Sequence, residues 1–408
     1  MIALLEGRRV LLGVTGSIAA YKAAELASQL TQAGAQVDVV LTEAAQQFVS
    51  ALTFQSLTGR RAYTEADLWG AEAHVLHVGL AQGADLLAIA PATADTLAKL
   101  AQGRADTLLT LTALAATCPL LLAPAMDAGM YGHPATQANL QILRSRGAIL
   151  VGPAEGRMAS GLVGPGRMVE PGELIGHVRL ALGRNGPLAG RRVVVTAGGT
   201  QEPLDPVRAL TNHSSGRQGY ALAQAALDRG AQVTLISAPT ALAAPIGAQV
   251  IPVRTAAQMG EALLPAAAQA DVLLMAAAVA DFRPTEPTEQ KHKRGRGTPK
   301  LELEPTEDLL AQVVEQRGRT ARPQVVVGFA AESQDLVQNA RAKLEAKGLS
   351  LVVANDITAP NAGFAADTNQ VTLLDPEGRV EALPLMSKAE VAEVVVDRVV
   401  ELLRSAGE

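Results

Sequence analysis

The sequence predicts an α/β protein of two consecutive domains, each built on a mostly parallel sheet. Two similar stretches open the two halves: "RRVLLGVTGS" at 8–17 and "RRVVVTAGGT" at 191–200. Each places a basic pair before a buried aliphatic run and a glycine-containing turn, a pattern typical of a strand that leads into a helix. Aliphatic runs then alternate with helical patterns in both halves, which predicts parallel strands joined by helices.

The alternation gives the expected elements of each domain. In the first half, strands are expected at 9–14, 36–41, 85–90, 119–123 and 148–151, and helices at 18–33, 94–102, 135–146 and 172–183. In the second half, strands are expected at 192–196, 232–236, 271–275, 325–328 and 350–354, helices at 217–229, 255–268, 307–316 and 335–347, then a hairpin from 371 and a helix from 388. The linker "GRNGPLAG" sets the expected domains at 1–186 and 187–408. The Gly/Pro-rich segment 152–172 predicts a lid without regular secondary structure.

Composition excludes several classes of protein. A formal net charge of -5 and only 2% aromatic residues over 408 residues argue against a nucleic-acid-binding protein. The single cysteine, Cys118, excludes an internal disulfide and fits a reducing cytoplasm. The N-terminus lacks a signal-peptide pattern, and the longest uncharged stretch, 107–126, is interrupted by threonines and Pro119, which favours a helix and a strand over a membrane span.

Four small-residue or polar motifs in the first half follow expected strands. They are "GVTGSIAAYK" at 13–22, Thr42, "APATADTLAKLA" at 90–101 and "APAMDAGMY" at 123–131. Helix N-termini at such turns can hold phosphate through backbone amides. The first motif alone is equally compatible with a tight turn, and its spacing is not that of a Rossmann dinucleotide site. Together, however, the motifs meet at the sheet edge where α/β proteins bind ligands.

The order of these motifs resembles the flavin-dependent cysteine decarboxylases, and in particular the phosphopantothenoylcysteine decarboxylase half of the bifunctional coenzyme A biosynthesis enzymes. The resemblance implies a flavodoxin-like domain that binds FMN. The implied FMN-binding residues are Gly16, Ser17, Ile18, Thr42, Thr93, Ala94, Thr96 and Ala125. It also implies a substrate-binding lid with Arg157, Met158 and Ala159, followed by Gly164, Gly166, Arg167 and Met168.

The resemblance also assigns a catalytic histidine and explains the flavin. His77 matches the family's histidine through its spacing to Leu80, Ala84 and Asp85, whereas His74 does not, and a metal pair formed by the two histidines lacks a third ligand. In this family a flavin oxidises the thiol carbon of the substrate, which makes loss of carbon dioxide feasible, and then returns the hydride.

Two positions depart from the family pattern. Where the family has an asparagine that donates a hydrogen bond to the substrate carboxylate, this chain has Asp127, and where the lid has a proton-donating cysteine, it has Ser160. An ionised Asp127 would repel the substrate by about 4 kcal/mol at about 4 Å and an effective dielectric of about 20. We therefore expect a neutral Asp127 in the complex. Ser160 is a much poorer proton donor than a thiol, so water or another residue must supply the proton if the reaction goes to completion.

The second half carries a second set of motifs. A Gly turn and a long polar loop in "TAGGTQEPLDPVRALTNHSSGRQG" at 196–219 offer donors suited to phosphates. Then follow "AAAVADFRP" at 276–284, "EQKHKRG" at 289–295, "GFAAES" at 328–333, "NARAKLEAKG" at 339–348 and "ANDI" at 354–357. This order resembles the phosphopantothenate–cysteine ligase half of the same enzymes, and implies a Rossmann-like domain.

The ligase resemblance implies that 4'-phosphopantothenate reacts with CTP to give an acyl-cytidylate, from which the amine of L-cysteine displaces CMP, with Mg²⁺ at the triphosphate. Lys291 is implied at the triphosphate, Asn212 at the acyl-cytidylate, and Asp281 at the nucleotide or the metal. The other implied nucleotide- or substrate-binding residues are Arg208, Ser214, Ser215, Gly216, Met275, Ala276, Ala277, Phe329, Lys343 and Lys347. The segment "PTED" at 305–308 departs from the family's usual NPD, which leaves that contact open.

Three alternatives remain beside the bifunctional enzyme. Asp127 and Ser160 allow an active ligase with an impaired or structural flavin domain. A regulatory flavoprotein without enzyme activity is disfavoured by the intact second half. A nicotinamide oxidoreductase is disfavoured because no GxGxxG motif is present. The family resemblance further implies trimeric flavin domains and dimeric ligase domains.

Overall fold

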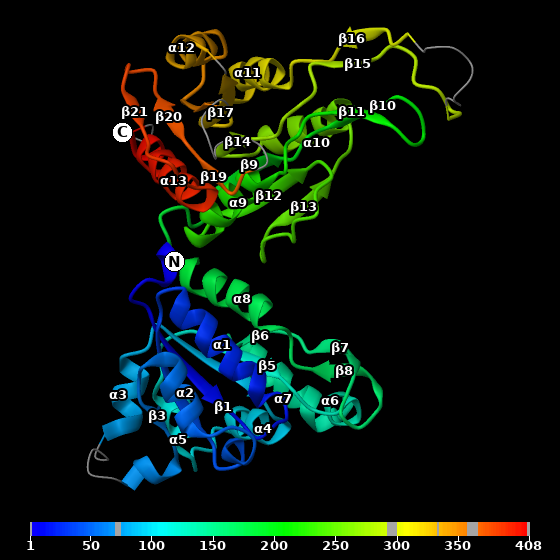
Figure 1. Ribbon diagram of the computed structural model, residues 1–408. Coiled ribbons are helices and arrows are strands. Elements are labelled where there is room, and N and C mark those ends of the chain that lie inside the picture. The colour runs from blue at the N-terminus through cyan, green and yellow to red at the C-terminus, as the bar shows by residue number, and fades with distance from the viewer. Residues whose placement is uncertain (1, 70–74, 292–299, 333, 357–365, 406–408) are drawn as a thin grey trace. The chain divides into compact units, whose positions relative to one another are not determined.

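The computed structural model describes residues 2–69, 75–291, 300–332, 334–356 and 366–405. It contains two compact units, Met1–Gly183 and Arg184–Glu408, so the break between them lies three residues before the boundary expected from the linker (Figure 1).

Unit 1 is built on one parallel sheet with the strand order β3-β2-β1-β4-β5-β6. Its strands are β1 (Arg9–Val14), β2 (Gln36–Leu41), β3 (Ala62–Tyr63), β4 (Leu86–Ala92), β5 (Leu120–Pro124) and β6 (Ile149–Leu150). Without the two-residue edge strand β3, the order is that of a flavodoxin-like sheet. The expected fold class of this half is confirmed, and the order changes direction between β1 and β4, where such sheets bind ligands.

Alternate side chains of each strand in unit 1 enter two hydrophobic cores on opposite faces of the sheet. On β1, Val10 and Leu12 face one core and Leu11 faces the other. The first core is covered by α1 (Ala20–Gln32), α2 (Ala51–Thr58) and α8 (Pro171–Gly183), and the second by α3 (Leu76–Gln82), α4 (Ala94–Gln102), α5 (Leu108–Ala115) and α7 (Pro134–Ser145). The sheet is therefore buried on both faces, which explains its continuous aliphatic strands.

The glycine- and proline-rich segment after β6 has regular structure, contrary to expectation. β7 (Ala154–Arg157) and β8 (Val163–Arg167) form an antiparallel hairpin with an irregular register after Ala154. The hairpin lies beside the short helix α6 (Ala128–Gly132) (Figure 1). Composition misled here because a two-stranded hairpin at the edge of a domain tolerates Gly and Pro that a central strand would not.

Unit 2 is built on an eight-stranded sheet with the order β13-β12-β9-β14-β17-β18-β20-β21. The strands β9 (Arg192–Ala197), β12 (Gln232–Ser237), β13 (Gln249–Pro252), β14 (Val272–Met275), β17 (Val325–Glu332) and β18 (Leu351–Asp356) are parallel, and the hairpin β20 (Val371–Leu374) and β21 (Val380–Ala382) joins antiparallel to β18. The parallel part has the Rossmann order, as expected.

Helices cover both faces of this second sheet. Helices α10 (Ala256–Ala267), α11 (Leu309–Thr320) and α12 (Leu336–Ala346) bury Leu263, Val313 and Leu344 against one face. Helix α9 (Arg217–Asp228) packs with the final helix α13 (Lys388–Ser405) and with β9. Three smaller two-stranded pairings complete the unit: β10 (Gln201–Pro203) with β11 (Ala209–Thr211), β15 (Phe282–Pro284) with β16 (Leu303–Pro305), and β19 (Thr368–Asn369) with β22 (Met386–Ser387).

None of the helices in the described residues is both long enough and apolar enough to cross a membrane. Residues 108–115 and 120–124 form the helix and the strand expected within the long uncharged stretch.

Candidate active sites

The loops that follow β1, β2, β4 and β5 meet around one cavity in unit 1. Its volume is about 620 Å³, which lies within the range of small-molecule and cofactor sites. The cavity is lined by Gly16, Ser17, Thr42, Glu43, Ala44, Glu65, Thr93, Ala94, Asp95, Thr96, Lys99, Asp106, Thr107, Leu109, Thr110, Ala125, Met126 and Met130. The position at the carboxyl ends of the strands is where the sequence motifs predicted a ligand.

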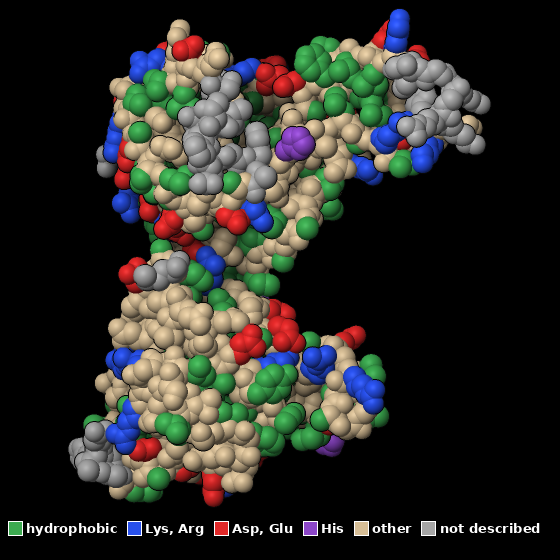
Figure 2. Space-filling view, viewed as in Figure 1, with side chains coloured by type: hydrophobic (Ala, Val, Ile, Leu, Met, Phe, Trp, Pro, Cys, Tyr) green, Lys and Arg blue, Asp and Glu red, His purple; other side chains and the backbone are tan. Residues whose placement is uncertain are grey.

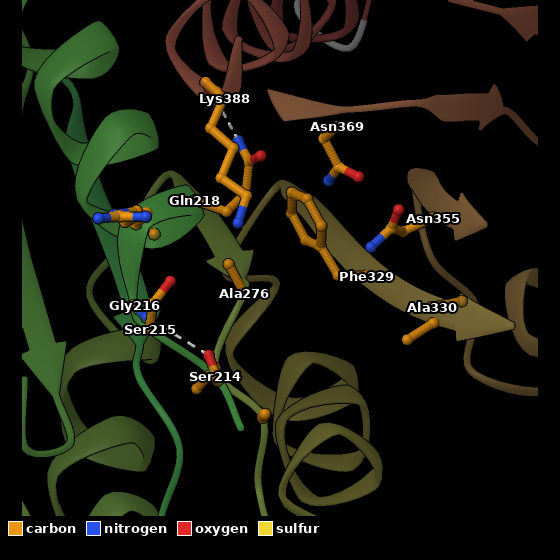
Figure 3. Close-up of a pocket in the computed structure, with 15 residues that line it drawn as sticks. Ser214, Ser215, Gly216, Gln218, Ala276, Phe329, Ala330, Asn355, Asn369 and Lys388 are labelled. Carbon is orange, nitrogen blue, oxygen red and sulfur yellow. Dashed lines mark hydrogen bonds between the residues drawn. The ribbon is translucent and has the colours of Figure 1, made fainter. Parts of the chain in front are cut away.

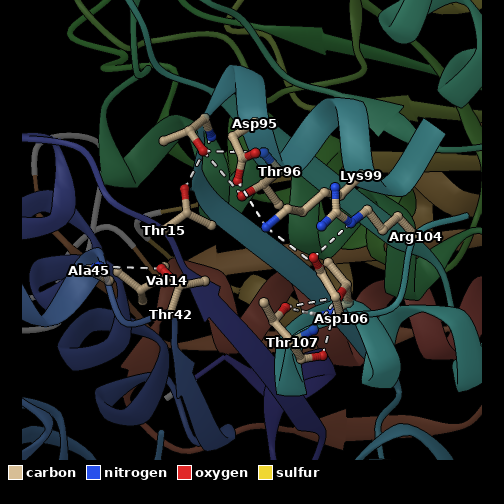
Figure 4. A network of polar contacts seen from close by, with 12 residues as sticks. Val14, Thr15, Thr42, Ala45, Asp95, Thr96, Lys99, Arg104, Asp106 and Thr107 are labelled. Atoms are coloured by element: carbon tan, nitrogen blue, oxygen red, sulfur yellow. Dashed lines mark hydrogen bonds and ion pairs between the residues drawn. The ribbon is translucent and has the colours of Figure 1, made fainter. Parts of the chain in front are cut away.

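A buried threonine ties two of these loops together. The Thr15 hydroxyl donates to the Pro91 carbonyl at 2.7 Å and accepts from the Thr93 amide at 3.1 Å. Thr93 then caps helix α4 by accepting from the Thr96 amide at 3.4 Å (Figure 4). The two polar turns are thereby held in fixed positions, as a preformed ligand site requires.

Charged groups occupy another part of the cavity lining. Lys99 lies between Asp95 at 3.3 Å and Asp106 at 3.5 Å, and Arg104 pairs with Asp106 at 2.7 Å (Figure 4). Burial raises the pKa of Glu65, whose Oε2 accepts from the Leu108 amide at 2.9 Å. The other oxygen, Oε1, is buried without a hydrogen-bond partner among the described residues.

The chemistry of this lining fits a flavin mononucleotide. Hydroxyl groups and the start of helix α4 supply donors and acceptors for a phosphate, a ribityl chain and the polar edge of the ring. Leu109, Met126 and Met130 supply the apolar surface that a tricyclic ring needs.

The structure brings together seven of the eight residues expected to hold the flavin. Ile18 is the exception, since it is not among the lining residues and is 62% exposed.

His77 lies on α3, is half-buried, and is also not among the lining residues. Its Nδ1 is buried without a partner among the described residues, whereas the competing His74 lies outside them. The sequence motifs assign no role to the charged residues Glu65, Lys99 and Asp106. Lys99 lies within the motif at 90–101, whereas Glu65 and Asp106 lie outside the motifs.

The two positions that depart from the family pattern contact each other. Ser160 Oγ donates to Asp127 Oδ2 at 2.6 Å, and the Gly129 amide donates to Asp127 Oδ1 at 3.0 Å. The hydrogen bond from Ser160, followed by that from Gly129, lowers the pKa of Asp127. The free protein therefore favours the carboxylate, and the burial expected to neutralise Asp127 is not present without a ligand. Arg157, Met158 and Ala159 lie beside this pair on β7 and the hairpin turn.

A pocket in unit 2 forms at the carboxyl ends of β9, β14, β17 and β18. It is lined by Ser214, Ser215, Gly216, Arg217, Gln218, Gly219, Ala276, Ala277, Ala278, Phe329, Ala330, Ala331, Asn355, Asn369 and Lys388. Figure 3 shows the Phe329 ring between Ala276 and the two asparagines, Asn355 and Asn369. Six residues expected at the nucleotide line this pocket: Ser214, Ser215, Gly216, Ala276, Ala277 and Phe329.

Glycines shape the polar end of this pocket. Gly216 precedes helix α9 with a φ of 77°, and a side chain at Gly216 would lie about 3.5 Å from the backbone of Gly198. At Gly219 a Cβ would come within 2.5 Å of the Ala197 Cβ, so glycine lets the first turn of α9 approach β9. The turn between strand and helix thus presents a helix N-terminus to the pocket, which suits a phosphate group.

The other residues expected at the nucleotide lie outside the pocket lining, in defined contacts. Asn212 donates to the Ala278 carbonyl at 3.2 Å, and Lys343 Nζ donates to the Phe329 carbonyl at 2.6 Å. Both side chains therefore bind the backbone of residues that line the pocket. Arg208 pairs with the buried Asp205 at 2.6 Å. Met275 is buried on β14, and Asp281 and Lys291 are exposed.

The segment left open by the sequence, 305–308, lies next to two of these residues. The Thr306 amide donates to the Asp281 carbonyl at 2.9 Å, and Lys347 pairs with Asp308. The loop therefore contributes to the same region even though its sequence departs from the family pattern.

The sequence motifs assign no role to four polar residues of this pocket, although Gln218 and Asn355 lie within the motifs at 196–219 and 354–357. Asn355 Oδ1 and Gln218 Oε1 are buried without partners among the described residues. Lys388, at the start of α13, is buried, and desolvation followed by the nearby Arg217 lowers its pKa against the opposing Asp367. Asn369 is buried as well. Asn355, Asn369 and Lys388 come from segments more than 100 residues beyond the Ser214–Gly216 turn, so only the fold brings them to Gln218 and that turn.

The described residues contain no group of three or more His, Cys, Asp or Glu side chains that could hold a metal ion. Asp281 is thus a single exposed carboxylate, which does not fit a resident magnesium site.

Fold and site together define a two-domain α/β protein with a flavoprotein domain followed by a nucleotide-binding-type domain. Family models agree with this division: residues 3–182 match the flavoprotein family, and residues 188–403 match the DNA/pantothenate metabolism flavoprotein C-terminal domain. The chain is 46% identical to the coenzyme A biosynthesis bifunctional protein CoaBC of Bacillus subtilis, over 99% of this chain and 100% of that protein. It is 44% identical to the protein of the same name from Vibrio cholerae, over 96% and 98%.

The chain belongs to the family of bifunctional coenzyme A biosynthesis proteins. The expected pair of activities, phosphopantothenoylcysteine decarboxylase and phosphopantothenate–cysteine ligase, is confirmed at the level of this family, and the alternative of a merely structural flavin domain is not favoured.

Two solved structures are similar to parts of the chain. The C-terminal domain of a CoaBC protein is 36% identical with a TM-score of 0.45, over 54% of this chain and 99% of that one. The FMN binding protein AtHal3 is 36% identical with a TM-score of 0.39, over 43% and 96%.

Proposed function

We propose that unit 2 joins L-cysteine to 4'-phosphopantothenate at the expense of CTP, and that unit 1 decarboxylates the product to 4'-phosphopantetheine with bound FMN. The observation that carries this proposal is the cavity of unit 1, where loops from four parallel strands present hydroxyls opposite an apolar surface. Substrates of this kind fit a cytoplasmic location, which we propose as well.

In unit 1, FMN would supply reversible hydride transfer at the carbon that bears sulfur. Ser17, Thr93 and Thr96 would hold its polar groups, and Leu109 and Met126 its ring. The β7–β8 hairpin would cover the substrate and exclude water. The Met126 amide donates to the Gly166 carbonyl at 3.0 Å, which fixes the hairpin against the strand end that leads into the cavity.

In unit 2, the ring of Phe329 would pack on the nucleotide base and the start of α9 would receive phosphate. The buried oxygens of Asn355 and Gln218 favour a base with an exocyclic amino group, because such a donor satisfies an acceptor that otherwise loses its hydrogen bond to water. Cytosine and adenine both carry this group and uracil does not. The choice of CTP over ATP rests on the family.

Lys291, Asn212 and Lys347 would act on the acyl-cytidylate and the phosphates, since conversion of the carboxylate into an acyl phosphate creates the leaving group that cysteine displaces. Magnesium would arrive with the triphosphate, because Asp281 alone does not make a metal site.

Assembly into oligomers is part of the proposal. In unit 1, Trp69, Leu52 and Leu114 are 87%, 68% and 66% exposed, so they are available for a contact with another copy. In unit 2, Phe282, Leu301 and Leu303 are exposed on and beside the β15–β16 arm, where Figure 2 shows hydrophobic side chains gathered. We propose trimeric flavin domains and dimeric ligase domains. His77, which lies outside the cavity lining of its own chain, would then serve a site completed by a second copy.

The flavin is tested by purifying the full chain and identifying any released chromophore by mass spectrometry. We expect yellow protein that releases FMN. Protein that stays colourless after incubation with FMN would contradict the proposal for unit 1.

The nucleotide is tested by incubating the protein with 4'-phosphopantothenate, cysteine, magnesium and one nucleotide at a time. We expect phosphopantothenoylcysteine or its decarboxylated product with CTP, little with ATP and none with UTP. Equal rates with CTP and UTP would contradict the assignment of the buried oxygens.

A further inference from the structure

The tip of the β7–β8 hairpin is bound to the end of β5 through a hydroxyl and a carboxylate. Asp127 comes three residues after Pro124, the last residue of β5, and its two oxygens have different partners. Oδ1 accepts from the Gly129 amide at 3.0 Å, whereas Oδ2 accepts from Ser160 Oγ at 2.6 Å. Because a backbone amide occupies Oδ1, Oδ2 is the oxygen available for protonation, and the Ser160 hydroxyl is its immediate neighbour.

Close packing of the β7–β8 hairpin against the residues after β5 holds Ser160 next to Asp127. A Cβ at Gly166 would lie 2.3 Å from the Met126 carbonyl oxygen, and a Cβ at Gly164 would lie 3.3 Å from the Ala128 Cβ. A side chain at Gly166 would therefore clash with the backbone just before α6, and one at Gly164 would make a tight contact with the first residue of α6. Ala125 and Met126 line the cavity, so the pair formed by Asp127 and Ser160 lies at its edge.

The proposed reaction requires a proton at the carbon that loses its carboxylate. When the bond between that carbon and the carboxylate breaks, carbon dioxide leaves and the bonding electron pair stays with the substrate. The carbon becomes the CH₂ of the product only when this pair forms a new C–H bond. Each turnover therefore consumes one proton, and a protein group near the departing carboxylate is suited to supply it.

We propose that Asp127 is the acid that supplies this proton and that the Ser160 hydroxyl relays it to the substrate carbon. Ser160 gives its own proton to the carbon and receives the proton of Asp127 Oδ2. Asp127 is left as a carboxylate, which takes up a proton from water when the next substrate binds. This inference rests on the proposed decarboxylation in unit 1. It assigns a joint function to the two residues that depart from the family pattern.

Substrate binding sets the protonation state that this relay needs. In the free protein, hydrogen bonds from Ser160 and Gly129 favour the Asp127 carboxylate. A substrate carboxylate placed beside it, with water excluded by the hairpin, makes two like charges share the site, which favours uptake of one proton by the pair. The proton taken up on binding is the one later transferred, so the charge of the site is balanced through the turnover.

The first test compares Asp127→Asn with Glu155→Gln, which removes an exposed carboxylate elsewhere on the same hairpin. Asparagine keeps the shape and can donate to the substrate carboxylate, but it holds no transferable proton. We expect Asp127→Asn to retain its flavin and to release carbon dioxide, while saturated product falls on the order of a hundredfold. A product lighter by two hydrogen atoms should form instead, with its two electrons left on the reduced flavin. Glu155→Gln should behave like the native protein. Native yield of saturated product from Asp127→Asn would overturn the proposal.

A rescue variant separates loss of the proton from damage to the site. In the double variant Asp127→Asn with Ser160→Cys, a thiol of pKa about 8.5 can itself donate. We expect it to restore saturated product, whereas Asp127→Asn with Ser160→Ala should not. Equal failure of both double variants would mean that position 160 does not deliver the proton.

A spectroscopic readout is independent of turnover. The probe is the phosphopantothenoyl amide of serine, in which a hydroxyl replaces the reactive thiol. Infrared difference spectra on its binding should show the C=O band of one protonated carboxyl in the native protein and none in Asp127→Asn. Absence of the band in a native protein that makes 4'-phosphopantetheine would overturn this inference alone. A native protein that releases no carbon dioxide would instead overturn the proposed function.

Discussion

At the scale of single residues, Phe329 in the pocket of unit 2 and Glu65 in the cavity of unit 1 lead to the most specific predictions for substitutions. Among the described residues, Phe329 is the only aromatic one that lines the pocket of unit 2. Glu65 is the one acidic side chain lining the cavity of unit 1 whose burial raises its pKa, among the described residues.

Phe329→Ala should weaken nucleotide binding. Stacking on an aromatic side chain is worth about 1–3 kcal/mol per base, so the KM for CTP should rise roughly tenfold. Steady-state ligase kinetics measure this change, with Phe48→Ala in unit 1 as a control for loss of an aromatic ring elsewhere. An unchanged KM for CTP would show that the base binds outside this pocket.

Glu65→Gln should stabilise the protein at neutral pH. Since the folded pKa of Glu65 is raised, its contribution to stability is fully present below the unfolded pKa and is lost as the pH rises through the folded pKa. A glutamine keeps an acceptor for the Leu108 amide and carries no charge at any pH. Melting temperatures at equal flavin content should therefore be higher for Glu65→Gln than for the native protein at mildly alkaline pH, and the two should converge at acidic pH. A difference that persists in acid would exclude titration of Glu65 as its cause.

At the scale of elements, the β7–β8 hairpin is the part of the fold on which the chemistry of unit 1 depends most. Sequence patterns located the principal strands and helices of both sheets to within a few residues, because buried parallel strands are continuous aliphatic runs. They did not locate the hairpin, whose glycines carry no hydrophobic period. They also missed helices α2 and α3 and the edge strand β13.

Gly166→Ala should displace the hairpin. The added Cβ would meet the Met126 carbonyl oxygen and the Met158 sulfur, at 2.3 Å and 2.9 Å, so the strand must move or strain by about 1–3 kcal/mol. We expect a large loss of decarboxylase activity with the ligase activity of the same preparation unchanged. Gly172→Ala is the matched control, because nothing lies within 4 Å of its added Cβ. Full decarboxylase activity in Gly166→Ala would show that the hairpin position does not matter to the reaction.

At the scale of the whole molecule, the two units are joined by chemistry, since the product proposed for unit 2 is the substrate proposed for unit 1. The sequence motifs indicated where both pockets would lie because most of the motifs begin where a strand ends. Asn369 and Lys388 could not be predicted in this way, since each is a single polar residue outside the motifs that only the fold brings to the pocket. His77 is a different case. Its spacing to Leu80, Ala84 and Asp85 matches the family's histidine, but it is not among the described residues that line the cavity of unit 1.

The most direct measurement of the central claim follows one reaction mixture by mass. The full-length protein with 4'-phosphopantothenate, cysteine, CTP and magnesium should release CMP, pyrophosphate and carbon dioxide, and form 4'-phosphopantetheine. Phosphopantothenoylcysteine that accumulates while CTP is consumed, with no carbon dioxide released from protein loaded with flavin, would contradict the account.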